Sequence, residues 1–257
     1  MKIKLMVVAI TQFLFLNSLA FAGLLIFPKA QIHRGFWMGG IQENTIESFR
    51  KAKLANQPMI ELDIQLSKDK KLIVFHDGEL KRLFNLDDKI ADLTALELNQ
   101  KAKIPTLNDV LSDPKIPQMV NIEIKNWGPN DERLETELKI IIKQNQAESR
   151  VVISSFDEIA LGICAKIMPD IRRAYLVGKG EEENNLVFIK RMKEKLEVAQ
   201  TNLIHINHNA VKDDLPKLLK EAGLSFSVWT LDDEKRAVEL LNAGALSIIT
   251  NRIDMKL

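Results

Sequence analysis

The sequence predicts an α/β fold, a (β/α)8 barrel that carries a short β-hairpin extension after its second strand. Two observations support this prediction. Short apolar runs of the kind found in strands alternate with segments of helical periodicity along most of the chain. The length of 257 residues, with 46% hydrophobic and 28% charged residues, is also typical of one barrel of this kind and argues against a disordered chain.

The expected elements follow one another in regular alternation. The strands are Ala30–His33, Met59–Gln65, Met119–Lys125, Val151–Ser155, Arg172–Val177, Leu203–Asn207, Ser225–Thr230 and Leu246–Thr250. The helices are Glu43–Ala55, Asp131–Gln144, Asp157–Met168, Glu181–Glu197, Asp213–Ala222 and Asp232–Ala243, with a short one near Thr94–Gln100 in the irregular connection from Gly78 to Ser112. Asp157 and Asp232 are suitable N-caps, and Gly223 and Gly244 stand where helices are expected to end.

A ninth apolar run, Leu72–His76, follows the second strand after only a few residues. A parallel crossover needs about ten or more residues, so we expect this run to fold back as an antiparallel hairpin. A turn centred on Lys68 and Asp69 would place His76 opposite Glu61, at one rim of the barrel.

The first 22 residues have the layout of a secretory signal peptide. Two lysines precede an uncharged, largely apolar run, and Ala20-Phe21-Ala22 offers a small-x-small cleavage site. We therefore expect residues 1–22 to be removed and residues 23–257 to form one exported domain, periplasmic or secreted, without stable membrane insertion. Residues 5–27 are also long enough to span a bilayer, so an uncleaved anchor is the alternative.

Charge and cysteine content exclude several classes of protein. The formal net charge is +1, so nothing indicates an extended basic face for nucleic acid. Cys164 is the only cysteine, which excludes an intramolecular disulfide and a thiolate-rich zinc site. It falls on the apolar stripe of its helix, where we expect it in the core. Nothing in the sequence indicates an oligomeric state.

Three carboxylates are expected close together at the barrel rim. Glu61 and Asp63 are two residues apart on a strand, so their side chains share one face, and aliphatic neighbours occupy the other. Glu123 repeats this design on a later strand, between Asn121 and Lys125. Three carboxylates without a thiolate suit a hard divalent ion, Ca²⁺ or Mg²⁺. We favour Ca²⁺ because its coordination shell is more forgiving and because exported proteins meet more of it.

His33 and His76 are the candidate proton-transfer pair, since histidine titrates near neutral pH. Arg34 and Lys125 add positive charge beside the predicted ion. Together these groups complement a phosphodiester, which has anionic oxygens to neutralise, a nucleophile to deprotonate and an alkoxide to protonate. The other two histidines fall on opposite faces of the segment 203–209, so they cannot both line one site on a regular strand.

Eight short motifs complete the pattern: His33-Arg34-Gly35, Glu43-Asn44-Thr45, Glu61-Leu62-Asp63, His76-Asp77, Asn121-Ile122-Glu123-Ile124-Lys125, Ser154-Ser155-Phe156, Val228-Trp229-Thr230 and Ile248-Ile249-Thr250. In this order they resemble the glycerophosphodiester phosphodiesterase family, and the likeness covers nearly all of the chain after residue 22. The resemblance implies a TIM-barrel fold and the hydrolysis of glycerophosphodiesters, small molecules of lipid metabolism, to glycerol 3-phosphate and an alcohol.

The resemblance also implies roles for individual residues. Glu61, Asp63 and Glu123 would bind the divalent ion, His33 and His76 would be the acid–base pair, Arg34 and Lys125 would hold phosphate, and Trp229 would form a wall of the substrate pocket. Within the histidine pair we assign the base role to His33 and the acid role to His76.

Three features depart from the family pattern. Gln42 stands where proline is usual, Thr250-Asn251-Arg252-Ile253 stands where Thr-Asp-x-Pro is usual, and the segment from His76 to Asn121 is short. None of them replaces a predicted metal or acid–base residue, so we expect them to bear on substrate choice more than on activity. Two alternatives stay open: a phospholipase of the D or C type that acts on intact lipid, and a catalytically inactive barrel that only binds.

Overall fold

Eight parallel strands close into a barrel in the computed structural model, which describes residues 26–125, 132–179, 184–212 and 214–257. The strands are β1 (Ala30–His33), β2 (Met59–Leu66), β4 (Met119–Ile124), β5 (Val151–Ser155), β6 (Arg172–Val177), β7 (Leu203–Asn207), β8 (Ser225–Trp229) and β9 (Ile248–Thr250). The helices between them are α2 (Ile46–Leu54), α6 (Arg133–Gln144), α7 (Glu158–Ile167), α8 (Asn185–Ala199), α9 (Leu215–Glu221) and α10 (Glu234–Asn242).

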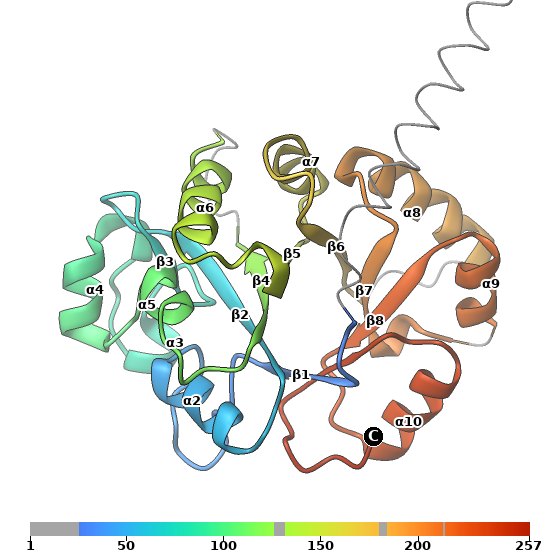
Figure 1. Ribbon diagram of the computed structural model, residues 1–257, viewed down its shortest axis with the longest axis horizontal. Coiled ribbons are helices and arrows are strands. Elements are labelled where there is room, and N and C mark those ends of the chain that lie inside the picture. The colour runs from blue at the N-terminus through green and yellow to red at the C-terminus, as the bar shows by residue number, and fades with distance from the viewer. Residues whose placement is uncertain (1–25, 126–131, 180–183, 213) are drawn as a thin grey trace, which may run out of the picture.

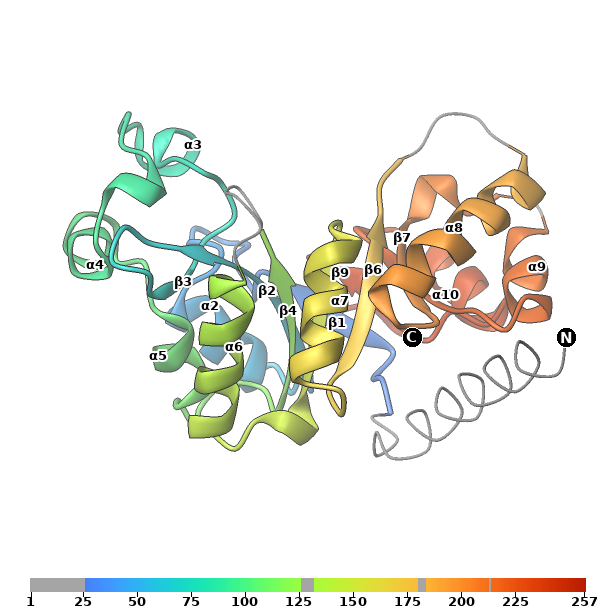
Figure 2. The same cartoon turned by 90° about the horizontal axis from the view of Figure 1, so that it is seen from above.

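The barrel closes because β1 pairs in parallel with both β2 and β9. The remaining strands follow in chain order around the ring, with the helices outside it (Figure 1, Figure 2). This arrangement confirms the predicted (β/α)8 barrel, and each expected barrel strand is present. Among the barrel strands, differences are confined to the strand ends.

The pleat of the strands sorts side chains between two environments. Ile60, Leu62 and Ile64 of β2 belong to the main hydrophobic core, together with residues of the surrounding helices such as Phe49. The alternate residues of β2 point into the barrel. Near the amino ends of the strands this interior is apolar, where Met59, Val152, Ala174 and Leu203 form a separate cluster with Phe27 packed against it. The polar residues are thereby left to the carboxyl ends.

The hairpin extension is present, with β3 (Leu72–Val74) antiparallel to β2. Its predicted register is wrong by one residue, since Ile64 faces Val74 and Leu66 faces Leu72. The cause is the turn, which has three central residues instead of two. Ser67 N–H donates to the carbonyl of Lys71, and Lys70 adopts a left-handed φ of 62°. A centre at Asp69 shifts every pairing by one position.

The connection after the hairpin is more structured than expected. It contains α3 (Lys81–Phe84), the 3-10 helix η1 (Ile90–Asp92), α4 (Ala95–Ala102) and α5 (Leu107–Leu111). Only α4 corresponds to the one predicted helix. Thr94 and Thr106 each close a capping box at a helix start, with Glu97 and Asp109 respectively. The segment has its own small core, which includes Phe75, and forms a lobe at the left of Figures 1 and 2.

The predicted helix ends are mostly confirmed. Asp157 caps α7 by accepting hydrogen bonds from the backbone of Ile159 and Ala160, and Gly223 and Gly244 follow α9 and α10 with left-handed φ. Cys164 is buried, as expected.

Asp232 is not the cap of α10. Its neighbour Asp233 caps that helix by accepting from the N–H of Arg236 at 2.7 Å, which leaves the Asp232 carboxylate available to other donors.

The predicted signal peptide falls on residues that lie outside the described part of the chain. Within the described part, no helix combines the length and the apolar character needed to cross a membrane.

Candidate active site

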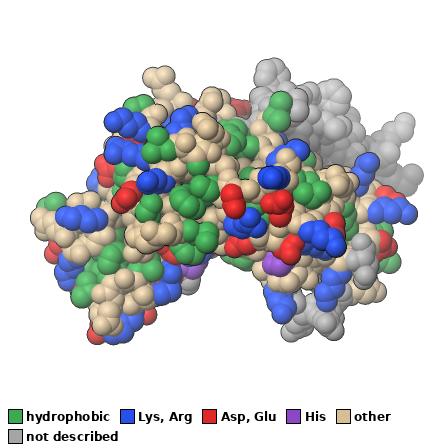
Figure 3. All heavy atoms as spheres, turned by 90° about the horizontal axis from the view of Figure 1, so that it is seen from below, with side chains coloured by type: hydrophobic (Ala, Val, Ile, Leu, Met, Phe, Trp, Pro, Cys, Tyr) green, Lys and Arg blue, Asp and Glu red, His purple; other side chains and the backbone are tan. Residues whose placement is uncertain are grey.

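A pocket opens at the carboxyl ends of the barrel strands. It is lined by His33, Arg34, Glu61, His76, Asn121, Glu123, Lys125, Ser154, Phe156, Leu176, Trp229 and Ile249. Seven of the eight predicted site residues are in this set, and the eighth, Asp63, contacts Arg34 and Lys125. Figure 3 shows the surface hollowed between the lobe and the rest of the molecule, with histidine side chains at the margin.

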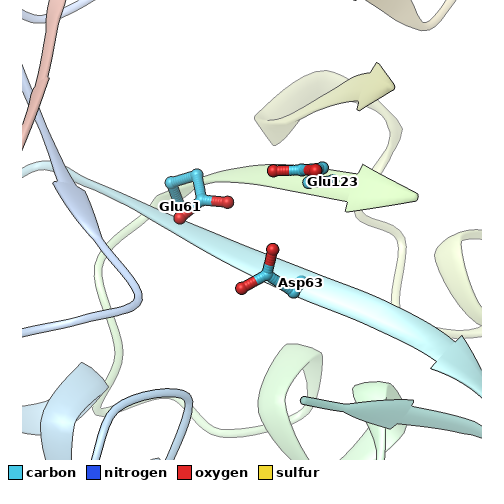
Figure 4. Close-up of side chains that lie close together, drawn as sticks. All are labelled: Glu61, Asp63 and Glu123. Carbon is cyan, nitrogen blue, oxygen red and sulfur yellow. The ribbon is translucent and has the colours of Figure 1, made fainter. Parts of the chain in front are cut away.

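The three predicted metal ligands face one another from β2 and β4 (Figure 4). Asp63 pairs in register with Glu123, and Glu61 precedes Asp63 by two residues on the same face. One oxygen from each of the three lies within 4.8 Å of the others, and all three residues are buried. Oε1 of Glu61 has no hydrogen-bond partner among the described residues, so this buried carboxyl oxygen lacks compensation.

Burial and mutual repulsion divide the protons unequally within this acidic cluster. Burial raises the pKa of Glu61 well above its usual value, and repulsion from Asp63 and Glu123 adds to the effect. Burial, followed by repulsion from Asp63, raises the pKa of Glu123 to about 7. Burial opposes ionisation of Asp63 too, but Lys125 and Arg34 lower its pKa well below the usual value. The donor set of three hard carboxylate oxygens therefore fits a divalent cation, which would let all three ionise.

Arg34 is held by an unusual turn directly after β1. Its φ of 59° is left-handed, and its backbone N–H donates to Oε2 of Glu61 at 3.1 Å. Its side chain lies 3.3 Å from Oδ2 of Asp63 and donates to Oε1 of Glu43 at 2.9 Å. Gly35 follows with a φ of +74°, and a Cβ there would lie 2.5 Å from Oγ of Ser48. The turn thus requires glycine at 35 to let α2 pack closely on it.

Lys125 supplies the second cation of the site. Its ammonium group contacts the carboxylate of Glu123 and lies 3.2 Å from Oδ1 of Asp63. Arg34 and Lys125 therefore stand on two sides of Asp63 and compensate its buried charge.

Asn44 fixes the orientation of Asp63, a role that the sequence did not reveal. Its Nδ2 donates to Oδ2 of Asp63 at 2.8 Å, and its Oδ1 accepts from the Asp63 backbone N–H at 3.3 Å. The Glu43-Asn44-Thr45 motif was visible in the sequence, but only its place in the fold shows what each residue contacts. Thr45 is the N-cap of α2, so this helix anchors the motif beside the cluster.

His33 presents its two ring nitrogens to different surroundings. Nδ1 lies 2.9 Å from Oδ1 of Asn251, and Nε2 lies 4.0 Å from Oε2 of Glu61. Burial, followed by repulsion from Arg34, lowers the pKa of His33 to about 4. The imidazole is therefore neutral at neutral pH and can accept a proton.

His76 is held by a chain of charged groups. Its Nδ1 lies 2.6 Å from Oδ1 of Asp77, and Oδ2 of Asp77 accepts from Nε of Arg82 at 2.5 Å. Arg82 also donates to Glu43 at 2.7 Å, so α3 of the lobe is joined to the rim of the barrel. Burial lowers the pKa of His76, although Asp63 opposes this effect. No sequence pattern singled out Arg82.

Aromatic side chains form one wall of the pocket. The rings of Phe156 and Trp229 meet edge to face with centroids 5.6 Å apart, and Nε1 of Trp229 donates to the carbonyl of His205 at 2.9 Å. Neither His205 nor His208 is among the residues that line the pocket. His205 is fully buried inside the barrel, where burial lowers its pKa to about 3.

Known proteins resemble the chain in sequence and in fold. Residues 33–255 match the model of the glycerophosphoryl diester phosphodiesterase family. A glycerophosphodiester phosphodiesterase of Caldanaerobacter subterraneus is 30% identical over 234 residues, which cover 85% of this chain and 92% of that protein.

Two solved structures illustrate the likeness in fold. The glycerophosphodiester phosphodiesterase of Thermotoga maritima has a TM-score of 0.70 at 28% identity and covers 89% of this chain and 96% of its own. A phosphodiesterase of Oleispira antarctica, solved with the product sn-glycerol-3-phosphate, has a TM-score of 0.75 at 26% identity and covers 87% and 93%.

We expect the binding of a divalent cation to displace protons from the acidic cluster. Because the pKa values of Glu61 and Glu123 are raised, protons compete with the cation at low pH, and this competition weakens as the pH rises through those values. The apparent affinity for Ca²⁺ should therefore rise from about pH 6 to about pH 8. Calorimetry in two buffers of different ionisation enthalpy measures the protons released.

Glu123→Gln is the matched control, since it removes one proton-binding ligand with little change in shape. It should weaken binding and reduce the number of protons released. An affinity that is the same at both pH values in the unaltered protein would contradict this description of the cluster.

Proposed function

Because this chain belongs to the glycerophosphoryl diester phosphodiesterase family, we propose that it hydrolyses glycerophosphodiesters to glycerol 3-phosphate and an alcohol with the help of a divalent cation. The observation that carries this proposal is the convergence of three carboxylates, two cationic side chains and two histidines in one pocket. The Oleispira antarctica structure, which holds sn-glycerol-3-phosphate, supports this product.

Two side chains of the pocket carry the positive charge that a phosphodiester anion needs. Arg34 and Lys125 both line the pocket and both contact Asp63. Glu61, Asp63 and Glu123 would hold the cation, which when bound supplies further positive charge next to the phosphate. The cation would also take over part of the contact that these carboxylates make with Arg34 and Lys125. Arg34 and Lys125 can then donate to phosphate oxygens instead, Arg34 through a planar fork and Lys125 as a point charge.

The partners of the two histidines support His33 as base and His76 as acid. His33 contacts a neutral amide at Nδ1, which gives an imidazolium little stabilisation, so this ring favours the neutral form that accepts a proton. His76 contacts the carboxylate of Asp77, which stabilises the protonated ring that donates a proton to the leaving alkoxide. The contrast between the two partners supports this assignment of roles.

We favour Ca²⁺ as the cation. Oxygens up to 4.8 Å apart can share one calcium ion, whose metal–oxygen distances are about 2.3–2.6 Å. Magnesium, at about 2.0–2.1 Å, draws its ligands closer and demands near-octahedral geometry.

Turnover should depend on the acidic cluster and on a dication. Purified protein should release glycerol 3-phosphate from glycerophosphocholine or glycerophosphoethanolamine when Ca²⁺ is present, and less when Mg²⁺ replaces it. Glu61→Gln, Asp63→Asn and Glu123→Gln should each nearly abolish turnover, because each removes a ligand charge. Full activity after dialysis against excess chelator would disprove the assignment, and faster hydrolysis of a monoacyl phospholipid than of either diester would favour the phospholipase D alternative.

Changing the leaving group should separate the two histidines. His33→Ala and His76→Ala should each lower kcat/KM by about 10²- to 10⁴-fold, the usual contribution of a proton-transfer group. A p-nitrophenyl diester needs little protonation of its leaving group, so it should restore the rate of His76→Ala and not that of His33→Ala. The unaltered enzyme should show a bell-shaped pH profile, in which activity falls at low pH as His33 gains a proton and at high pH as His76 loses one.

The double variant should lose much less than the product of the two single losses, because both groups act in one transition state. Rescue of His33→Ala alone would reverse the roles. A flat pH profile with no rescue would show that neither histidine transfers a proton.

We also propose export, supported by the composition of the first 22 residues. Amino-terminal sequencing of the exported protein should find Gly23 as the first residue. An intact Met1 species in the membrane fraction would favour the uncleaved anchor.

A further inference from the structure

We propose that Asp232 and Asn251 are positioning residues that hold His33 in the tautomer protonated on Nδ1, so that the lone pair of Nε2 faces the pocket. This inference rests on the proposed role of His33 as the base, which needs that lone pair. Neither Asp232 nor Asn251 lines the pocket, so both would act on the reaction only by orienting His33.

The Asn251 side chain bridges His33 and Asp232. Its Oδ1 lies 2.9 Å from Nδ1 of His33, and its Nδ2 donates to Oδ2 of Asp232 at 2.7 Å. The backbone N–H of Asn251 donates to the other carboxylate oxygen of Asp232 at 2.8 Å. Asp232 thereby holds both the main chain and the side chain of Asn251.

The fold brings these three residues together from distant parts of the chain. Ile32 of β1 pairs in register with Thr250 of β9, so His33, the last residue of β1, lies next to Asn251, the first residue after β9. The hydroxyl of Thr250 donates to Asp232 at 2.7 Å, which fixes the carboxylate from a third direction.

The direction of these hydrogen bonds follows from the chemistry of the carboxylate. Thr250 and Asn251 donate to Asp232, and together these bonds outweigh its partial burial and keep its pKa below the usual value. An ionised carboxylate only accepts hydrogen bonds, so the amide of Asn251 must turn its NH₂ toward Asp232 and its oxygen toward His33.

The oxygen of Asn251 in turn decides the tautomer of His33. An amide oxygen only accepts, so Nδ1 of His33 must donate to it. A neutral imidazole carries one N–H, and Nε2 is therefore left with its lone pair. A carboxylate outside the pocket thus sets which nitrogen of the base is free.

The tautomer can be read directly by two-bond ¹H–¹⁵N correlation spectra of the labelled full-length protein, with and without Ca²⁺. The chain has four histidines, and His33→Gln assigns the signal of His33. We expect Nδ1–H in the unaltered protein. Asp232→Asn should shift His33 toward the Nε2–H tautomer. The oxygen of asparagine at 232 stays with the backbone N–H of Asn251 and the hydroxyl of Thr250. Its NH₂ then faces the Asn251 side chain, whose amide turns its own NH₂ toward His33.

Two further variants sharpen this test. Asp233→Asn is the matched control: it makes the same change one residue away, at the cap of α10, and should leave the tautomer of His33 unchanged. Combining Asp232→Asn with Asn251→Asp reverses the polarity of the pair and should restore Nδ1–H, because the carboxylate at 251 again accepts from His33 while the amide at 232 donates to it.

Kinetics provide the second readout. Asn251→Leu should lower kcat by roughly 10- to 100-fold, the usual cost of removing a group that orients a functional side chain. KM should change little, because the substrate contacts remain. Asp232→Asn should also lower kcat. The double variant that combines it with Asn251→Asp should have a higher kcat than Asp232→Asn alone.

The spectra distinguish failure of this inference from failure of the proposed function. Nδ1–H with the expected response to Asp232→Asn supports the inference even if no phosphodiester is hydrolysed. Nε2–H in the unaltered protein, or a tautomer that ignores both Asp232→Asn and Asn251→Leu, would overturn it even in a fully active enzyme.

Discussion

Repulsion among three buried carboxylates is the constraint on which the rest of the pocket depends. Glu61, Asp63 and Glu123 are placed together by the register of two neighbouring strands, and the water that would normally screen them is excluded. Arg34 and Lys125 compensate only part of this charge. The left-handed turn at Arg34 and the closely packed Gly35 beside it have a purpose in this setting. Together they give the backbone the geometry that brings a guanidinium against the acidic cluster.

The two candidate catalytic histidines, His33 and His76, are held by residues from different parts of the chain and by different kinds of hydrogen-bond partner. His76 depends on the lobe, since Arg82 of α3 binds both Asp77 and Glu43. His33 depends on Asn251, the residue that directly follows β9, the last strand of the barrel. One histidine has a charged neighbour backed by an arginine, and the other has a neutral neighbour backed by a carboxylate. A pair of chemically identical side chains is thereby given unequal proton affinities by what surrounds each ring.

Most of the fold and the inner part of the site could be predicted from sequence, because both follow from periodicity. Glu61 and Asp63 alternate with Leu62 and its aliphatic neighbours, so the sequence alone predicts that the two carboxylates share one face of the strand. The hairpin register was not, because one left-handed lysine in the turn shifts it. The roles of Asn44, Arg82 and Asp232 could not be read either. Each depends on contacts between residues far apart in the chain, and such contacts leave no local pattern.

The pairing of β1 with β9 has a consequence for how the protein is made. His33 is synthesised well before Asn251, its hydrogen-bond partner 218 positions later. Contacts of such long sequence separation form late in folding, because a large loop must close before they contribute. Glu61, Asp63 and Glu123, by contrast, belong to β2 and β4 and are all synthesised before the strands β6 to β9. The contact between His33 and Asn251 therefore forms only after β9 has been synthesised, and a product that ends before β9 would lack it.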